Sequence, residues 1–207
     1  MKDSQGDVVE GRTNWRRFAI AMGIPTVAAG VLVAGVASGA VAASFSVSGT
    51  QFKLSADKLV GEGFTQYSGR LDTETVQKQT GQKYLIAAKS GIRSADITNL
   101  CQTVAVGPVV LRIEAGKNTP VHADNLLIGM SELSGDAEFT NINIGQDAST
   151  MGKADPVERG DVGGFGQQAD KVTITNLHQV AYSTQASTFK LTGMSLKLFV
   201  GDGKECF

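Results

Sequence analysis

The order of apolar and polar residues changes once along the chain, near residue 43. Beyond that point apolar side chains alternate with polar ones, which is the period of two expected for strands with one buried face. The alternation recurs in SFSVSGTQFKLSA, KYLIAAKSGIRSADITNL, GPVVLRIEAG, DAEFTNINIG and KVTITNLHQVAYSTQASTFKLTGMSLKLFV. These runs predict a mainly β domain over residues 44–207, built as an antiparallel sandwich or jelly-roll-like barrel of about eight to ten strands.

The segment before the change has a different pattern. Residues 18–43 carry no charge, are rich in Ala, Gly and Val, and follow Arg12, Arg16 and Arg17. Positive charge ahead of an apolar run keeps the amino terminus in the cytoplasm and directs the following residues across the membrane. We therefore predict a cytoplasmic tail over residues 1–17 and one hydrophobic helix over 18–43, followed by an exported domain.

The fate of that helix stays open. Small residues around Ala42 and Ala43 suit a signal peptidase, whereas the apolar run is long enough to remain as a transmembrane anchor. Cleavage predicts a secreted protein. Retention predicts a cell-membrane protein that faces outward and contacts the membrane through residues 18–43.

Composition limits the class of protein. A chain of 207 residues with 42% hydrophobic and 19% charged residues is sufficient for one buried core. The formal net charge of -1 gives no clustered positive charge for phosphate chains, so we expect no nucleic-acid partner. We also expect neither a cofactor nor a metal site.

The two cysteines are Cys101 and Cys206. An even number of cysteines in an exported domain predicts one disulfide. Neither cysteine has a second Cys or a His at the spacing that a metal site or a thiol nucleophile requires.

Two further patterns concern turns and loops. The pair Ala-Asp precedes a strand-like run at residues 56, 95, 123 and 169, and we interpret it as a turn device at strand entrances. The stretch from about 145 to 168 is rich in Gly and Asp and lacks periodicity, which predicts a long exposed loop.

The stretch GMSEL around Ser131 is similar to the Gly-x-Ser-x-Gly elbow of ester hydrolases, with Leu133 in place of the second glycine. Strand-like residues follow it, so we predict that Ser131 lies on a strand. If the protein is an esterase, the candidate catalytic residues are Ser131, His122 and Asp136, because His122 is the better placed of only two histidines.

Several runs, SFSVSGTQFKLSADKL, TNLCQTV, INIGQDAST, FGQQADKVTI and GKECF, resemble an actinobacterial family of exported or membrane-anchored proteins of unknown function. Some members of that family are catalogued as cholesterol esterase. The resemblance spans the chain from Arg12 onward. Its esterase label implies hydrolysis of lipid esters outside the cell.

Two hypotheses follow. The first is a cell-envelope protein whose β domain binds a lipid, another apolar ligand or a membrane-protein partner. The second is a secreted hydrolase of sterol or lipid esters.

Overall fold

The computed structural model describes residues 50–72, 83–201 and 203–207. All of them belong to one compact unit, Phe45–Phe207. The predicted cytoplasmic tail, 1–17, and the predicted hydrophobic helix, 18–43, lie outside the described residues. Within the described part of the chain, no helix has the length and apolar character needed to cross a membrane.

The described residues form nine strands in one antiparallel sheet, so the prediction of a mainly β, antiparallel domain is confirmed. A single turn of 3-10 helix, η1, follows β6 at Ala148–Thr150. The strands are β1 (Phe52–Asp72), β2 (Tyr84–Thr98), β3 (Leu100–Val106), β4 (Val109–Ala115), β5 (Val121–Thr140), β6 (Asn143–Asp147), β7 (Phe165–Gln185), β8 (Thr188–Lys190) and β9 (Ser195–Val200).

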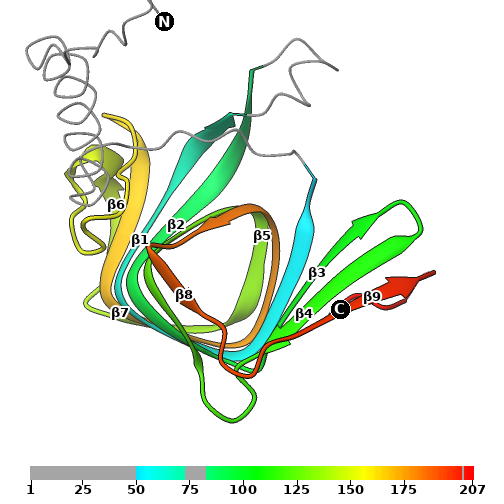
Figure 1. Ribbon diagram of the computed structural model, residues 1–207. Coiled ribbons are helices and arrows are strands. Elements are labelled where there is room, and N and C mark those ends of the chain that lie inside the picture. The colour runs from blue at the N-terminus through cyan, green and yellow to red at the C-terminus, as the bar shows by residue number, and fades with distance from the viewer. Residues whose placement is uncertain (1–49, 73–82, 202) are drawn as a thin grey trace, which may run out of the picture. The chain divides into compact units, whose positions relative to one another are not determined.

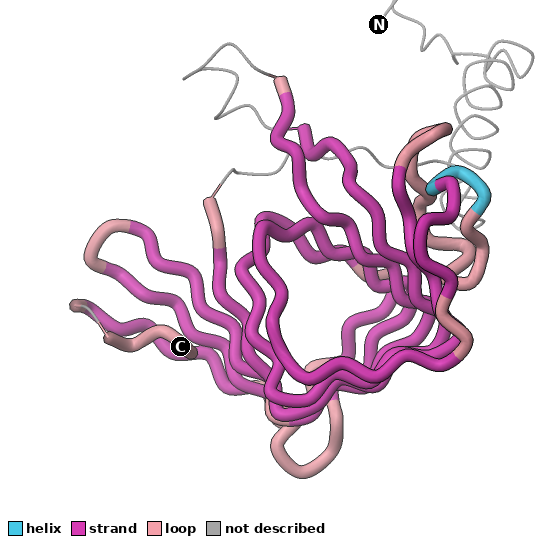
Figure 2. Tube along the Cα trace, turned by 180° about the vertical axis from the view of Figure 1, so that it is seen from behind, coloured by secondary structure: helices cyan, strands magenta, loops and turns pink. Residues whose placement is uncertain are grey.

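Four long strands close into a ring (Figures 1 and 2). β1 pairs with β2 and with β7, while β5 pairs with the same two strands. The remaining strands extend from this ring: β3, β4 and β9 continue outward from β1, β6 pairs with β7, and β8 pairs with β5. The sheet is therefore continuous through hydrogen bonds and is not divided into two separate stacked sheets.

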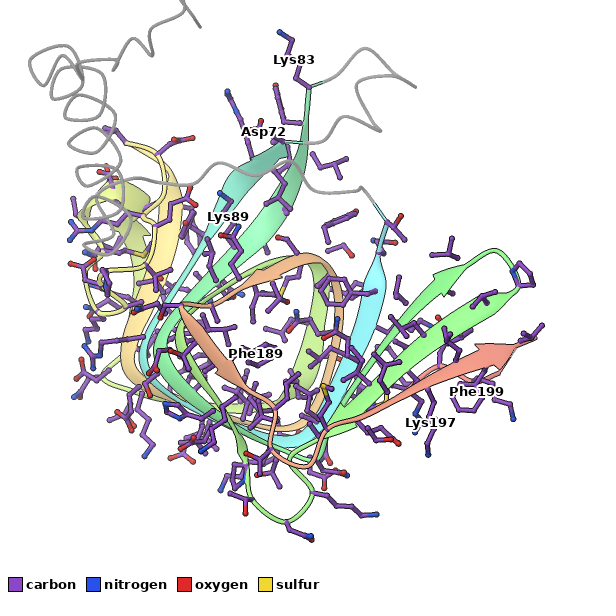
Figure 3. All side chains as sticks on the ribbon, in the orientation of Figure 1. Asp72, Lys83, Lys89, Phe189, Lys197 and Phe199 are labelled. Carbon is purple, nitrogen blue, oxygen red and sulfur yellow. A yellow bond between two sulfur atoms is a disulfide. The ribbon has the colours of Figure 1, made fainter. Side chains whose placement is uncertain are left out.

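Alternating apolar side chains fill the ring and form the core. Phe64, Ile92, Leu126, Val172 and Leu177 are each at most 2% exposed and belong to one cluster. Phe189 on β8 packs against this cluster and projects into the ring in the view of Figure 3. The period of two thus places apolar residues from all four ring strands on the inner side of the sheet.

The Ala-Asp pairs do not lie at strand entrances, so that interpretation was wrong. All four pairs fall inside long strands, with each alanine at most 5% exposed. The aspartates point outward and bind neighbouring side chains: Asn99 Nδ2 donates to Asp57 Oδ2 at 3.1 Å, and Asn141 Nδ2 donates to Asp170 Oδ2 at 2.7 Å. Both asparagines have positive φ, so each pair stabilises a backbone bend between strands.

The loop predicted at 145–168 is present but shorter and less exposed than expected. β6 ends at Asp147 and β7 begins at Phe165. Met151 in the intervening segment is fully buried, and the Gln168 side-chain oxygen accepts hydrogen bonds from Gly152 N at 3.0 Å and Lys153 N at 3.1 Å. These contacts hold the segment against the ring, which residue composition alone did not indicate.

The predicted disulfide is confirmed: Cys101 on β3 is bonded to Cys206. It fastens the C-terminal residues across one face of β3. Lys53 Nζ forms an ion pair with Glu205 Oε2 at 2.8 Å, and Cys206 N donates to Thr103 Oγ1 at 3.3 Å.

Candidate functional site

One end of the ring holds a cleft of about 430 Å³. All four ring strands contribute to it. β1 supplies Gln66, Tyr67 and Ser68, β2 supplies Ile86, Ala87 and Ala88, β5 supplies Met130 and Ser131, and β7 supplies Phe165 and Gln167. The volume falls in the range of small-molecule sites, which are often found at the mouths of closed sheets.

Small side chains create this space. Ala88 pairs with Ser68 on one side and with Met130 on the other, so two of the three residues in this row fill little volume. Met130 is 1% exposed and belongs to the core. The cleft therefore ends on the apolar core of the ring.

The rim of the cleft carries two large apolar side chains that are left in solvent. Ile86 is 66% exposed and Phe165 is 61% exposed. They come from β2 and β7, which are neighbours of β1 on opposite sides. An apolar molecule that enters the cleft would cover both of them.

Two polar side chains of the cleft, Gln66 and Gln167, belong to a chain of hydrogen bonds. Gln66 Nε2 donates to Ser90 Oγ at 3.1 Å, and the side-chain amide of Gln167 donates to Gln66 Oε1. This chain of hydrogen bonds joins the neighbouring strands β7, β1 and β2 along the wall of the ring. It offers an amide anchor for the polar end of a ligand.

Tyr67 lies between the cleft and the loop. Its hydroxyl donates to the Glu158 backbone oxygen at 2.9 Å, and Lys89 Nζ contacts the Glu158 carboxylate at 2.9 Å. Burial raises the pKa of the Tyr67 hydroxyl above its ordinary value of 10.0, and the negative charges of Glu158 and Asp161 add to this shift. Tyr67 therefore stays protonated at neutral pH and is unsuited to act as a base.

Ser131 lies within β5, as predicted, and not on a turn between a strand and a helix. Its Oγ accepts a hydrogen bond from Gln51 Nε2 at 2.9 Å and donates to the Val180 carbonyl oxygen at 3.3 Å. The side chain lines the edge of the cleft. Neither of these two hydrogen-bond partners of Ser131 is a histidine.

The other two candidate residues lie elsewhere. His122 is on the same strand nine residues before Ser131, a separation of about 30 Å along an extended chain. Its Nδ1 contacts Asp96 Oδ1 at 2.8 Å and its Nε2 contacts Asp124 Oδ1 at 3.2 Å. Asp136 accepts a hydrogen bond from Asn176 Nδ2 at 3.0 Å. Each of the three candidate residues therefore has different hydrogen-bond partners, and the structure does not bring the three together.

The second histidine, His178, lines a smaller cleft of about 350 Å³ on β5 and β7. Its ring meets the edge of the Phe207 ring with centroids 4.6 Å apart. Ser131 borders this cleft as well. Among residues 50–72, 83–201 and 203–207, no three metal-binding side chains gather closely enough to hold an ion.

Sequence comparison identifies the family of the chain. Residues 48–207 match a family of unknown function, DUF6230. The chain belongs to that family. Neither the curated proteins nor the solved structures contain a match to it. Membership of DUF6230 fits the predicted resemblance to a family of unknown function, and it assigns no reaction or ligand.

Reasoning from the sequence missed most residues of the cleft. Ile86 and Phe165 are separated by nearly eighty residues in the sequence, and they line the same cleft only because the ring closes. The available signal was local: Ile86 is an apolar residue in an alternating run beside several small ones. That pattern marks a strand and does not distinguish a cleft wall from a core position.

Proposed function

We propose that this protein is an exported or membrane-anchored cell-envelope protein whose β domain binds a lipid or another apolar ligand in the cleft. The observation that supports the proposal is the cleft itself, with a floor of core residues, walls of small side chains and two exposed apolar residues at its rim. The predicted hydrophobic segment 18–43 supports an envelope location. A membrane-protein partner would bind the same rim.

Binding is tested with the compact unit, residues 45–207, after circular dichroism has verified its β structure. A fluorescent long-chain fatty acid is titrated into the protein, and saturable binding is expected. Ile86→Asp places a carboxylate at the rim and should weaken binding about tenfold, because covering the exposed part of one aliphatic side chain contributes about 1–2 kcal/mol.

Val162→Asp is the control. Val162 is 86% exposed, but it lies in the loop between η1 and β7 and outside the cleft. Its substitution should leave the dissociation constant unchanged. Equal weakening by both variants, or linear uptake of the probe without saturation, would contradict binding in the cleft.

The second candidate function is hydrolysis of a sterol or lipid ester. The observation that favours it is Ser131 at the edge of an apolar cleft. Hydrolysis of a chromogenic fatty ester by the pure protein, with loss of activity in Ser131→Ala and unchanged activity in His122→Ala, whose side chain binds Asp96 and Asp124 away from Ser131, would establish this function. Unchanged activity in Ser131→Ala would assign the hydrolysis to another site or to a contaminant.

A further inference from the structure

A second apolar surface lies away from the cleft, on the strands that extend outward from β1. Cross-strand partners place their side chains on the same face of a sheet. The pairings of β3 with β4 and of β4 with β9 therefore form aliphatic rows on one face. We call this surface the β3–β4–β9 face. It carries the polar Gln102, opposite Ile113, and its aliphatic residues are Val104, Val106, Val109, Leu111, Ile113, Leu196, Leu198 and Val200.

The outer part of the β3–β4–β9 face is exposed, whereas Val104, Leu111 and Ile113 are half-buried. On β9, Leu196 is 52%, Leu198 is 67% and Val200 is 81% exposed. Apart from Gln102 the named side chains of the face are aliphatic, and none is charged. A sheet face of this composition is normally buried against a second layer.

The opposite face of the same strands is different. It carries Arg112 and Lys197, and the C-terminal residues cross it through the Cys101–Cys206 disulfide. Lys197 and Phe199 mark this face on β9 in Figure 3. The C-terminal residues thus contact β3 on this opposite face, through Cys101 and Thr103, and not on the aliphatic face.

The size of the face decides against a second copy of the chain as its main occupant. Three strands about 4.8 Å apart and six residues long offer about 300 Å². A specific protein interface needs about 800 Å² from each partner. A lipid surface has no such minimum, because even a small apolar face inserts when the protein is already held at the membrane.

The chain enters the sheet beside this face. β1 begins at Phe52, and its first paired residues lie against β3, with Lys53 opposite Thr103. Residues 44–51 separate β1 from the predicted hydrophobic segment and reach at most about 28 Å when fully extended. A retained anchor would therefore keep the β3–β4–β9 face close to the bilayer.

We propose that the β3–β4–β9 face docks onto the lipid bilayer that residues 18–43 cross, with its aliphatic side chains in the boundary between headgroups and acyl chains. The inference rests on the membrane-anchored form of the proposed function. It is independent of ligand binding in the cleft.

The test uses the full chain reconstituted in phosphatidylethanolamine and phosphatidylglycerol vesicles. The native cysteines are joined in the disulfide, so an introduced thiol can be labelled selectively with an environment-sensitive fluorophore. Val200→Cys places the label on the face. Val162→Cys is the control, because Val162 is 86% exposed but lies in the loop between η1 and β7.

The label at 200 should emit at shorter wavelength and be quenched several-fold more by lipids with brominated acyl chains than the label at 162. Leu198→Gln should reduce that quenching, whereas Lys197→Gln on the opposite face should not. If the protein floats with the vesicles but both labels remain in water, the docking of the face is overturned and the membrane anchor is not. Protein that does not float with the vesicles would overturn both the anchor and the docking.

A second copy as occupant has its own signature. In a dimer, emission of the label at 200 would shift to shorter wavelength without quenching by brominated lipids, and the shift would decrease as the protein is diluted in lipid. That result would overturn the proposal in favour of a dimer.

Discussion

Removal of the Cys101–Cys206 disulfide tests how strongly the C-terminus contributes to the fold. The double variant Cys101→Ser/Cys206→Ser removes the covalent link and leaves every other side chain of the C-terminal residues unchanged. The two cysteines are 105 residues apart. For a closed loop of about 100 residues, the chain-entropy account gives about 4.7 kcal/mol of stabilisation.

This value is an upper limit, because the native state of the variant can release its C-terminal residues. The ion pair of Lys53 with Glu205 is partly exposed, with about a third of each side chain in solvent. Such a pair contributes at most about 1 kcal/mol, so it does not replace the disulfide. We expect a loss of about 3–4 kcal/mol in the free energy of unfolding, which corresponds to a melting temperature lower by about 6–16 °C for a domain of this size.

The assay is thermal unfolding followed by circular dichroism, with and without a phosphine reductant. The reductant should lower the melting temperature of the native protein to that of the double variant, and it should not change the variant. Coincident melting curves for the oxidised protein, the reduced protein and the variant would refute the reasoning, because the disulfide would then contribute nothing to the free energy of unfolding.

Two further expectations concern the backbone and one titrating side chain. Gly63 has a φ of +69°, and a Cβ there would lie 2.2 Å from the Lys153 carbonyl oxygen. Gly63→Ala should therefore lower stability in urea unfolding by about 2–4 kcal/mol, against about 1 kcal/mol for Gly107→Ala, which has a positive φ but open space around it; equal losses would show that the contact with Lys153 is unimportant. The hydrogen bond to Asp96 raises the pKa of His122 above its ordinary value of 6.5, with Asp124 adding to the effect. The protonated pair therefore stabilises the fold fully below pH 6.5, and this stabilisation is lost as the pH rises through the higher folded-state pKa. The proton NMR titration midpoint of His122 should lie above 6.5 and fall in Asp96→Asn, and a midpoint at or below 6.5 in the native protein would contradict this.

The strands could be predicted from the sequence because burial on one face of a strand has a local signature. GPVVLRIEAG contains β4, and the alternating run that begins at Lys171 contains most of β7 together with β8 and β9. The disulfide could also be predicted, since only two cysteines were available. Each of these inferences depends on residues close in sequence or on elimination.

The ring and its cleft could not be predicted in this way. Alternation of apolar and polar residues shows which face of a strand is buried, but it does not show which strands pair with that strand. The pairing of β1 with β7 joins Leu54 to Gln179, and no local pattern near either residue specifies it. The positions of His122 and Ser131 illustrate the same point: they are near in sequence, but they lie far apart along one extended strand.

Closure of the ring by β1 and β7 has a consequence for the order of events during synthesis. Tyr67 pairs with Gly166, and synthesis of the residues between them takes about 5–20 s at typical elongation rates. During that interval the edge of β1 that later pairs with β7 is unsatisfied, and β7 does not yet cover the apolar side chains of β1. A nascent chain of this protein is thus expected to need a holding factor, such as a chaperone, until its last third has emerged.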